Sequence, residues 1–194
     1  MKRFFDFILS LLAIIILSPL LLILSLTVLI DDGAPVIFKQ DRVGKDNKLF
    51  KVYKFRTMKK NTANVPTAEL KDAGNYITKS GRMLRKTSLD ELPQLFNILK
   101  GDMSFVGPRP LIPEETKIRA LRLENGIYSV RPGMTGLAQI NGRDTLDDES
   151  KTRYDKKYIE EQSLLLDIKI IIQTVFVVLL GKDIVEGNEK TEKR

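Results

Sequence analysis

The sequence has 194 residues, enough for one domain with a substantial core, and it contains neither cysteine nor histidine. These absences exclude a thiol nucleophile, a Ser-His or Cys-His couple and a zinc site built from histidine and cysteine. Covalent chemistry must therefore use a hydroxyl group, a lysine or a carboxylate, and a bound metal should be a hard ion with oxygen ligands. The formal net charge of +7 indicates a phosphate-rich partner: nucleic acid, anionic lipid or a nucleotide.

Residues 7–30 form an uninterrupted run of 24 residues without a charge. As a helix, this run would be roughly 36 Å long, which exceeds a hydrocarbon core of about 30 Å. The run is too long for the apolar region of a secretory signal, and it lacks a small-x-small cleavage site. Two interpretations remain: a helix that spans the membrane, and a re-entrant helix that enters and leaves on the same side.

Two features favour the re-entrant interpretation. Ser18-Pro19 lies in the middle of the run, where a proline removes a helical hydrogen bond, and the Ser18 hydroxyl can bind a backbone group that the proline leaves free. Basic residues also flank both ends of the run, which draws both ends to the cytoplasmic side. We therefore predict a re-entrant membrane helix over residues 1–34, broken at Ser18-Pro19, and a cytoplasmic domain over residues 35–194 that forms one functional unit with it.

The next part of the chain alternates with a period of two. Residues 35–44 and 48–58 are predicted to be two strands of a small β-hairpin, with a polar turn at residues 44–47. Lys54 and Arg56 share one face of the second strand with Phe50 and Val52. The two cations are either solvated residues at the end of an edge strand or ligands of phosphate oxygens.

Residues 81–110 contain an acidic pair, Asp90 and Glu91, between a basic run and an arginine flanked by prolines. Apolar residues at helical spacing predict a helix that starts at residues 88–90, has Pro93 in its first turn and ends at Gly101. Residues 88–91, Ser-Leu-Asp-Glu, also match a capping box, so capping of the helix is a structural alternative for Asp90.

The functional interpretation uses the same helix start. A carboxylate at a helix N-terminus near arginines should stay ionised and can attack phosphorus. Glu91 beside it can hold Mg²⁺, which takes one or two carboxylates together with phosphate oxygens. Pro108 and Pro110 restrict the direction of Arg109, whose planar guanidinium matches phosphate. A surface arginine in an ordinary proline-rich turn is the alternative for Arg109.

The C-terminal half supplies fewer signals. Residues 131–143 are predicted to be a glycine-containing loop in which Arg143 contacts phosphate or nucleotide, although plain turns explain the segment equally well. Helices are expected over residues 111–123 and 147–162. Residues 164–180 form a mostly apolar helix, which is either buried in the core or lies in the membrane interface, and we favour the interface.

Several long motifs in this chain resemble those of the monotopic phosphoglycosyl transferases, the bacterial sugar transferase family. The resemblance covers nearly the whole length, through Lys2-Arg3 and Asp6, Ser18-Pro19, and the segments at residues 54–58, 81–95, 101–111 and 131–143. It implies an α+β fold: a mostly helical, membrane-associated domain with a re-entrant helix, a small β-hairpin and interfacial amphipathic helices. The chain departs from the family in lacking a tryptophan after Arg143.

The resemblance also implies a reaction. Such enzymes transfer a sugar 1-phosphate from a UDP-sugar to a polyprenol phosphate, usually undecaprenyl phosphate, and release UMP. This is the first membrane step of bacterial glycoconjugate or polysaccharide assembly. By this resemblance Asp90 is the nucleophile of a two-step reaction through an aspartyl–phosphosugar intermediate, Glu91 is associated with Mg²⁺, and Arg85 binds the polyprenol phosphate.

The expected partners are thus a UDP-sugar, undecaprenyl phosphate and membrane lipid, with no nucleic acid, at the cytoplasmic face of the bacterial inner membrane. Small members of the family often use N-acetylated or diacetamido sugars, and we favour such a donor. The competing hypothesis is a non-catalytic membrane-anchored protein whose basic face binds anionic lipid or nucleic acid. That hypothesis gives the pair Asp90-Glu91 no purpose.

Overall fold

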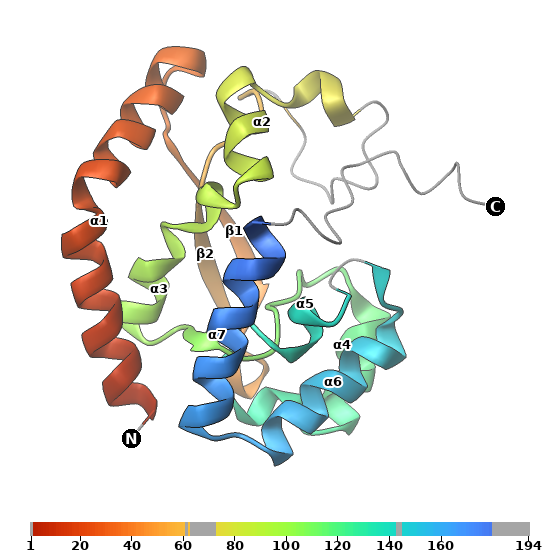
Figure 1. Ribbon diagram of the computed structural model, residues 1–194. Helices are drawn as coiled ribbons and strands as arrows, with labels where there is room; N and C mark the ends of the chain where they lie inside the picture. Colours follow the sequence, from red (N-terminus) through yellow and green to blue (C-terminus); the bar gives the residue numbers. More distant parts are fainter. Residues whose placement is uncertain (1, 61, 63–72, 143–144, 180–194) are drawn as a thin grey trace.

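The computed structural model describes residues 2–60, 62, 73–142 and 145–179, and it is an α+β structure dominated by helices (Figure 1). The helices are α1 (Lys2–Asp32), α2 (Lys79–Lys86), α3 (Gln94–Lys100), α4 (Thr116–Glu124), α5 (Leu137–Ile140), α6 (Asp148–Glu160) and α7 (Leu164–Leu179). The strands are β1 (Ile37–Val43), β2 (Leu49–Phe55), β3 (Ser104–Val106) and β4 (Gly133–Thr135). Short 3-10 turns are η1 (Lys45–Asn47), η3 (Ala73–Tyr76), η4 (Leu89–Glu91) and η5 (Ile127–Ser129).

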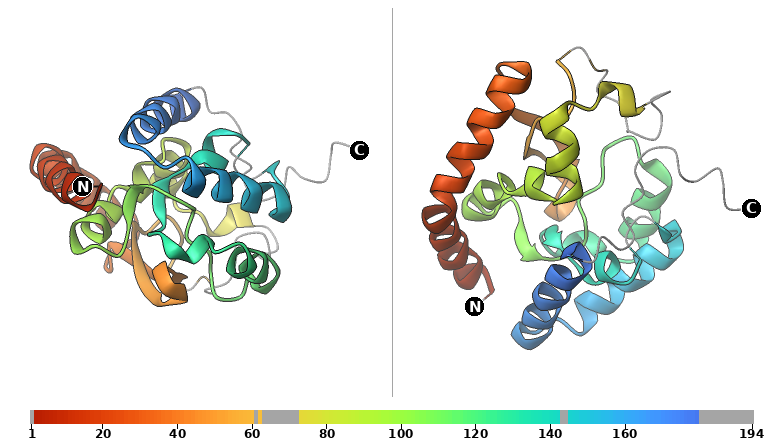
Figure 2. Two further views of the ribbon diagram at one scale, coloured as in Figure 1. Left: turned by 90° about the horizontal axis from the view of Figure 1, so that it is seen from below. Right: turned by 45° about the horizontal axis from the view of Figure 1, so that its top comes forward.

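Helix α1 runs along one side of the molecule, opposite α4 and α6, and is bowed outward in both Figure 1 and the right view of Figure 2. It stays helical through Ser18 and Pro19, so the predicted break does not interrupt the helix. Pro19 cannot donate to the carbonyl of Ile15, and the Ser18 hydroxyl donates to that carbonyl instead, at 2.8 Å. The predicted use of Ser18 is thus confirmed, whereas the re-entrant path remains a prediction.

The first turns of α1 are bound to the rest of the protein by polar contacts. Arg3 donates to the carbonyls of Ile98 and Leu99 at the end of α3, at 2.6 and 2.7 Å. The buried carboxylate of Asp6 accepts from the Ser104 hydroxyl at 3.1 Å and from a backbone N–H of β3. These contacts fix the start of α1 against α3 and β3, the two elements that follow the acidic pair in the chain.

Much of α1 nevertheless remains open to its surroundings. Within the part of the chain that the structure describes, it is the one helix that is long and apolar enough to cross a membrane. In its most apolar stretch of 18 residues, 11% is buried inside the protein. Large exposed side chains run along its length, among them Phe4, Ile16, Ile23 and Ile30. Such an exposed apolar surface fits a membrane anchor.

The predicted β-hairpin is confirmed. Strands β1 and β2 pair antiparallel, from Ile37 opposite Phe55 to Val43 opposite Leu49. The turn between them contains Asp46 and Asn47 with positive φ values of 56° and 57°, a conformation that these two residue types tolerate well. Val52 on β2 packs with Leu95 and Ile98 of α3, so the hairpin forms one wall of the core beneath α3.

The segment around the acidic pair differs from the sequence prediction. A 3-10 turn, η4, contains Asp90 and Glu91, and α3 starts only at Gln94 with Pro93 as its N-cap. A helix that started at Ser88 would require a backbone donor at position 93, which proline lacks. Ser88 has a φ of 55° and makes no capping bond, so the predicted capping box does not form. Gly101, with a φ of 98°, does end the helix as predicted.

Residues 131–142, expected to be a loop, contain strand β4 and the short helix α5. Strand β4 pairs in parallel with β3, and the two backbones approach so closely that a Cβ atom on Gly133 would lie 2.1 Å from the Gly107 nitrogen. Glycine is therefore required at this crossing. The helix predicted from residue 111 begins later, at Thr116, whereas α6 lies within its predicted segment.

Helix α7 is buried along one face. Ile170 and Asp167 are buried, while Leu165, Ile168, Ile172, Val175 and Phe176 are each more than half exposed. A fully buried core helix is therefore the wrong description. Lys2 pairs with Asp167, so the first turns of α1 and α7 lie side by side.

Candidate active site

The acidic pair lies in η4, between α2 and α3, and faces β2 and the segment that follows β3. Glu91 is buried, and its Oε1 accepts a hydrogen bond from Lys54 Nζ at 2.7 Å. Arg109 Nη2 lies 3.5 Å from the same oxygen. Lys54 is therefore not a solvated end of an edge strand. The hairpin and the loop after β3 deliver two cations to one buried carboxylate.

The electrostatics of Asp90 differ from the expectation based on a helix N-terminus. Burial raises the pKa of Asp90 above its ordinary value, and the negative charge of Glu91 raises it further. Lys54, Arg85 and Arg109 lower the pKa of Asp90 without fully compensating. A three-residue 3-10 turn offers little helix dipole to oppose burial. The structure therefore gathers Asp90, Glu91 and all three of these cations in one charged cluster.

Arg85 is oriented by a residue that the sequence analysis did not single out. Its Nε donates to Thr57 Oγ1 at 2.9 Å, and the Thr57 side chain is buried just after β2. The carbonyl of Thr57 accepts from the backbone N–H of Thr78, next to the start of α2. Thr57 thus joins the hairpin to the helix that carries Arg85.

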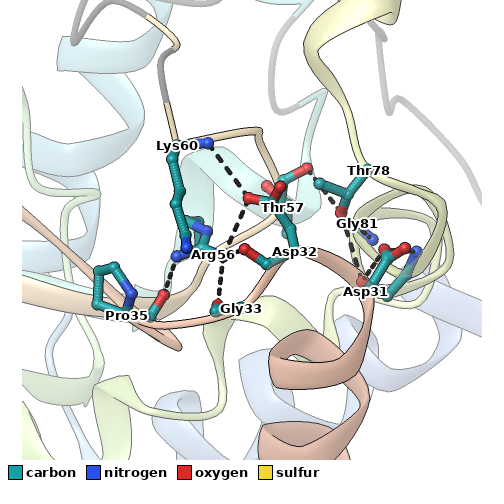
Figure 3. Close-up of polar contacts among 10 residues, drawn as sticks. Asp31, Asp32, Gly33, Pro35, Arg56, Thr57, Lys60, Thr78 and Gly81 are labelled. Atoms are coloured by element: carbon teal, nitrogen blue, oxygen red, sulfur yellow. Dashed lines mark hydrogen bonds and ion pairs between the residues drawn. The ribbon is translucent and has the colours of Figure 1, made fainter.

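Arg56 lies in a different cluster, at the end of α1 (Figure 3). Its guanidinium donates to the carbonyl of Pro35 and to those of Asp32 and Gly33, at 2.9 and 2.6 Å for the latter two, and it pairs with the Asp32 carboxylate at 3.0 Å. These contacts favour a structural role that binds the end of α1 to the hairpin. The binding of phosphate by Arg56 remains an untested prediction that this geometry does not favour.

The carboxylate of Asp31 completes the attachment of α1 at this end. It accepts from the backbone N–H and the hydroxyl of Ser80 in the first turn of α2, at 2.8 and 2.7 Å. These bonds lower the pKa of Asp31, the hydroxyl bond having the larger effect. Helix α1 is therefore tied to α2, the helix that carries Arg85.

The segment Pro108-Arg109-Pro110 is held on both sides by its backbone carbonyls. Pro108 accepts from the Gly133 N–H at 2.9 Å, and Arg109 accepts from Arg122 at 2.6 Å. Arg122 also forms a fully buried ion pair with Asp155 of α6. The two prolines thus act together with tertiary contacts to place Arg109.

A second arginine, missed by the sequence analysis, lies near Arg109. Arg42 of β1 donates to the Pro110 carbonyl at 3.2 Å and to the Gln40 side chain. Burial, followed by repulsion from Arg109, lowers the pKa of Arg42 to about 10. For Arg42 the sequence offered one weak signal, namely its place within the predicted first strand. For Arg122 it offered none, because this residue lies on a helix to which the sequence analysis assigned no role.

Two groups of predicted residues lie elsewhere. Arg143 falls outside the described residues. Ser18 and Pro19 belong to the middle of α1, where they shape the helix and make no contact with the acidic pair among the described residues.

A cavity of about 210 Å³ opens beside the charged cluster. Glu91, Ser88 and Arg109 form its polar end. The rest of its wall is mainly hydrocarbon and comes from Phe105, β4, α5 and α7; it comprises Phe105, Met134, Ile140, Ile171, Val175 and Val177, together with Thr135, Gln139 and Thr174. One side of the cavity is therefore built by the helix whose outer face is exposed and apolar.

Comparison with known proteins identifies the family. The family model for bacterial sugar transferases matches residues 1–181. The chain belongs to the bacterial sugar transferase family. An uncharacterized sugar transferase, EpsL of Bacillus subtilis, is 41% identical, with the match covering all of this chain and 95% of EpsL.

Two further relatives are longer proteins. The undecaprenyl-phosphate galactose phosphotransferase of Salmonella typhimurium is 42% identical over 92% of this chain. The UDP-glucose:undecaprenyl-phosphate glucose-1-phosphate transferase of Klebsiella pneumoniae is 45% identical over 93% of this chain. In both cases the match spans 40% of the relative's own length.

The acidic residues of this sugar transferase offer limited ligands for a metal. Among the described residues, no group of three or more acidic side chains could enclose an ion. The pair Asp90-Glu91 does fit Mg²⁺ when substrate phosphates complete its coordination, because that ion commonly uses one or two carboxylates. The raised pKa of Asp90, caused partly by the charge of Glu91, is the kind of repulsion that a cation relieves.

Proposed function

We propose that this sugar transferase moves a sugar 1-phosphate from a UDP-sugar to undecaprenyl phosphate and releases UMP. The observation that carries this proposal is the pair of half-buried Asp90 and buried Glu91, with Lys54, Arg85 and Arg109 around it. Relatives that share more than 40% identity are named for this type of reaction. A merely lipid-binding basic face would have no use for two adjacent carboxylates at its centre.

In the proposed mechanism, ionised Asp90 attacks the β-phosphorus of the UDP-sugar. The bond from that phosphorus to the bridging oxygen breaks, and UMP leaves with the bonding electrons. The phosphate of the lipid acceptor then attacks the aspartyl phosphosugar, which forms the lipid diphosphosugar and regenerates the Asp90 carboxylate. Catalysis of such transfers rests on positioning and on neutralisation of phosphate charge, which Lys54, Arg85 and Arg109 supply here.

Glu91 is the residue that we propose to hold Mg²⁺. When bound, the ion would neutralise charge on the transferring phosphoryl group and on the leaving UMP. Lys54 and Arg109 hold the Glu91 carboxylate from one side and so fix its direction. Asp90 is thereby left to act as the nucleophile.

The proposed location is the cytoplasmic face of the bacterial inner membrane. The apolar surface of α1 would enter the membrane and return to the same side, and the exposed face of α7 would lie in the interface. The first turns of both helices lie together through Lys2 and Asp167, which suits a shared membrane surface. Both substrates, one soluble and one lipid, would then meet at the acidic pair.

The donor sugar is a separate question. The relatives are named for galactose, glucose and N-acetylgalactosamine, so family membership leaves the sugar open. We keep the N-acetylated or diacetamido donor as the working hypothesis. Release of UMP across a panel of UDP-sugars distinguishes these donors.

The first test is Asp90→Asn. The full chain in detergent, given UDP-sugar and undecaprenyl phosphate, should lose UMP release by about 10³-fold or more, because the nucleophile is absent. Wild-type protein given labelled UDP-sugar alone should release UMP and retain phosphosugar. Asp46→Asn, an exposed substitution in the hairpin turn, is the matched control. Full activity in Asp90→Asn would refute the mechanism, and lipid binding that is steeply salt-sensitive and indifferent to this change would support the non-catalytic hypothesis.

A further inference from the structure

The cavity beside the charged cluster has one polar end and a long hydrocarbon wall. Glu91 and Arg109 lie at the polar end. The hydroxyls of Thr135 and Thr174 hydrogen-bond to each other at 2.7 Å, and the Thr174 hydroxyl is also 2.7 Å from the Ile170 carbonyl. These bonds satisfy both hydroxyls within the protein. Gln139, whose Oε1 accepts no hydrogen bond among the described residues, is the one remaining polar side chain of a wall that is otherwise hydrocarbon.

The small number of polar groups along the wall indicates which class of ligand the cavity binds. A hexose carries hydroxyls around its ring, and six hydrocarbon side chains would leave most of them unpaired, which is costly. A hydrocarbon chain has no such requirement. The volume of about 210 Å³ exceeds the roughly 150 Å³ of an engineered apolar cavity that accepts benzene, so it has room for one or two branched five-carbon units.

The position of the cavity indicates which hydrocarbon-containing molecule it binds. One wall is formed by Ile171 and Val175 of α7, and the outer face of this helix exposes Ile168, Ile172 and Phe176. The cavity therefore connects an exposed apolar face with the carboxylate and guanidinium at its other end. A molecule with a phosphate head and a hydrocarbon tail matches both ends at once.

We propose that this cavity binds the first isoprene units of the lipid phosphate acceptor, next to its phosphate. The inference rests on the proposed function and adds a binding site to it. The phosphate lies toward Arg109, the first units contact Phe105, Met134 and Val175, and the remaining chain continues into the membrane. A chain from an ordinary membrane phospholipid is the rival source of the same chemistry.

The test uses two adjacent, similarly exposed positions on α7. Val175 lines the cavity and is 53% exposed, whereas Phe176 is 59% exposed and does not line it. Val175→Asn and Phe176→Asn each place one neutral polar group on the helix. The acceptor is geranyl phosphate, a short soluble molecule with two isoprene units, which removes any dependence on membrane binding. The KM values for acceptor and for UDP-sugar are measured from UMP release by the full chain in detergent.

We expect Val175→Asn to raise the KM for geranyl phosphate about tenfold and to leave the KM for the UDP-sugar unchanged. Phe176→Asn should change neither constant. An increase in the KM for the UDP-sugar would overturn the inference and assign the cavity to the donor. Equal effects of both substitutions, or altered membrane binding with unchanged KM values, would also overturn it.

A second pair of substitutions distinguishes a blocked cavity from misfolding of the protein. Ile171→Trp fills the cavity, whereas Ile172→Trp enlarges an exposed residue on the same helix, and only the first should raise the KM for geranyl phosphate. If the wild-type protein releases no UMP from any UDP-sugar, the proposed function fails. Direct binding of geranyl phosphate then tests the cavity alone: loss of binding in Ile171→Trp supports the site, and unchanged binding overturns it.

Discussion

At the residue scale, the groups around Asp90 have opposing effects on the pKa of its carboxylate. Burial and the charge of Glu91 raise its pKa, while Lys54, Arg85 and Arg109 lower it. A nucleophile that must be ionised is thus kept in a site that disfavours its charge, as is common at functional sites. Binding of a cation, and loss of the carboxylate charge on attack, would both relieve this repulsion.

Removing Lys54 should make the activity more sensitive to acid. Lys54 is the cation with the largest lowering effect on the pKa of Asp90, so Lys54→Met should raise that pKa further. The acid limb of the pH–rate profile for UMP release should move to higher pH, with a loss of about 10²-fold in rate near neutrality. Lys51→Met, at an exposed lysine on the same strand, is the control and should leave the profile unchanged. An unshifted acid limb in Lys54→Met would show that Asp90 does not govern it.

Asp90→Asn should also change stability with a definite sign. Because the pKa of Asp90 is higher in the folded protein than in the unfolded chain, its contribution to stability is intact at low pH and is lost as the pH rises through the folded pKa. Asparagine carries no charge at any of these pH values. Thermal unfolding in detergent should therefore give the variant a Tm at pH 7.5 that equals or exceeds that of the wild type. Any advantage should shrink toward pH 4, and a lower Tm at pH 7.5 would contradict this account.

At the scale of elements, the acidic pair is held between pieces from distant parts of the chain. Turn η4 receives Lys54 from β2, Arg109 from the segment after β3, and Arg85 from α2. Thr57 connects two of these elements through its hydroxyl and its carbonyl. The geometry of the site therefore depends on how the hairpin docks against α2.

Thr57→Val tests this connection. The substitution keeps the shape of the side chain and removes the acceptor for Arg85 Nε, which should cost about 1–2 kcal/mol in stability. Transfer should fall about tenfold, mainly through a higher KM for the lipid phosphate if Arg85 binds it. Thr57→Ser restores the hydroxyl and should restore both properties. Failure of serine to rescue the variant would indicate that the methyl group, and not the hydrogen bond, matters.

At the scale of the whole molecule, α1 is attached by polar contacts at both ends, and between them one face packs against the core while the outer face is exposed. Arg3 and Asp6 bind its start to α3 and β3, and Arg56 binds its end to the hairpin. Two points of attachment on one body are easier to reconcile with a helix that returns to the same membrane surface than with one whose ends lie across a bilayer. Figure 1 shows both ends of the bowed helix turned toward that body.

Cysteine labelling checks this topology, because the natural chain contains no cysteine. Phe4→Cys and Lys39→Cys place single thiols before and after the uncharged run of residues 7–30, and Lys156→Cys marks α6. In vesicles of defined orientation, a membrane-impermeant thiol reagent should reach all three from the same, cytoplasmic side. Labelling of Phe4→Cys from the opposite side alone would instead establish a spanning helix.

Much of the fold was predictable because its signals are local. Alternation with a period of two gave the hairpin, the uncharged run gave α1, and Gly101 marked the end of α3. The predicted helix start at residues 88–90 was wrong, because α3 begins at Gln94, directly after Pro93, which has no backbone N–H to donate. Strand β4 was missed because its pairing with β3 depends on glycines that meet only in the folded chain.

The sequence by itself determined the chemistry that this protein can use. Without histidine or cysteine, and with Asp90-Glu91 set among cations after a long apolar run, it indicated carboxylate chemistry on phosphate near a membrane. Only the tertiary structure decided which cations reach the pair. Lys54 and Arg56 are two residues apart on the chain, yet one faces Glu91 and the other binds the end of α1. Contacts between distant segments and burial set those positions and the pKa of Asp90, and neither can be read from local spacing.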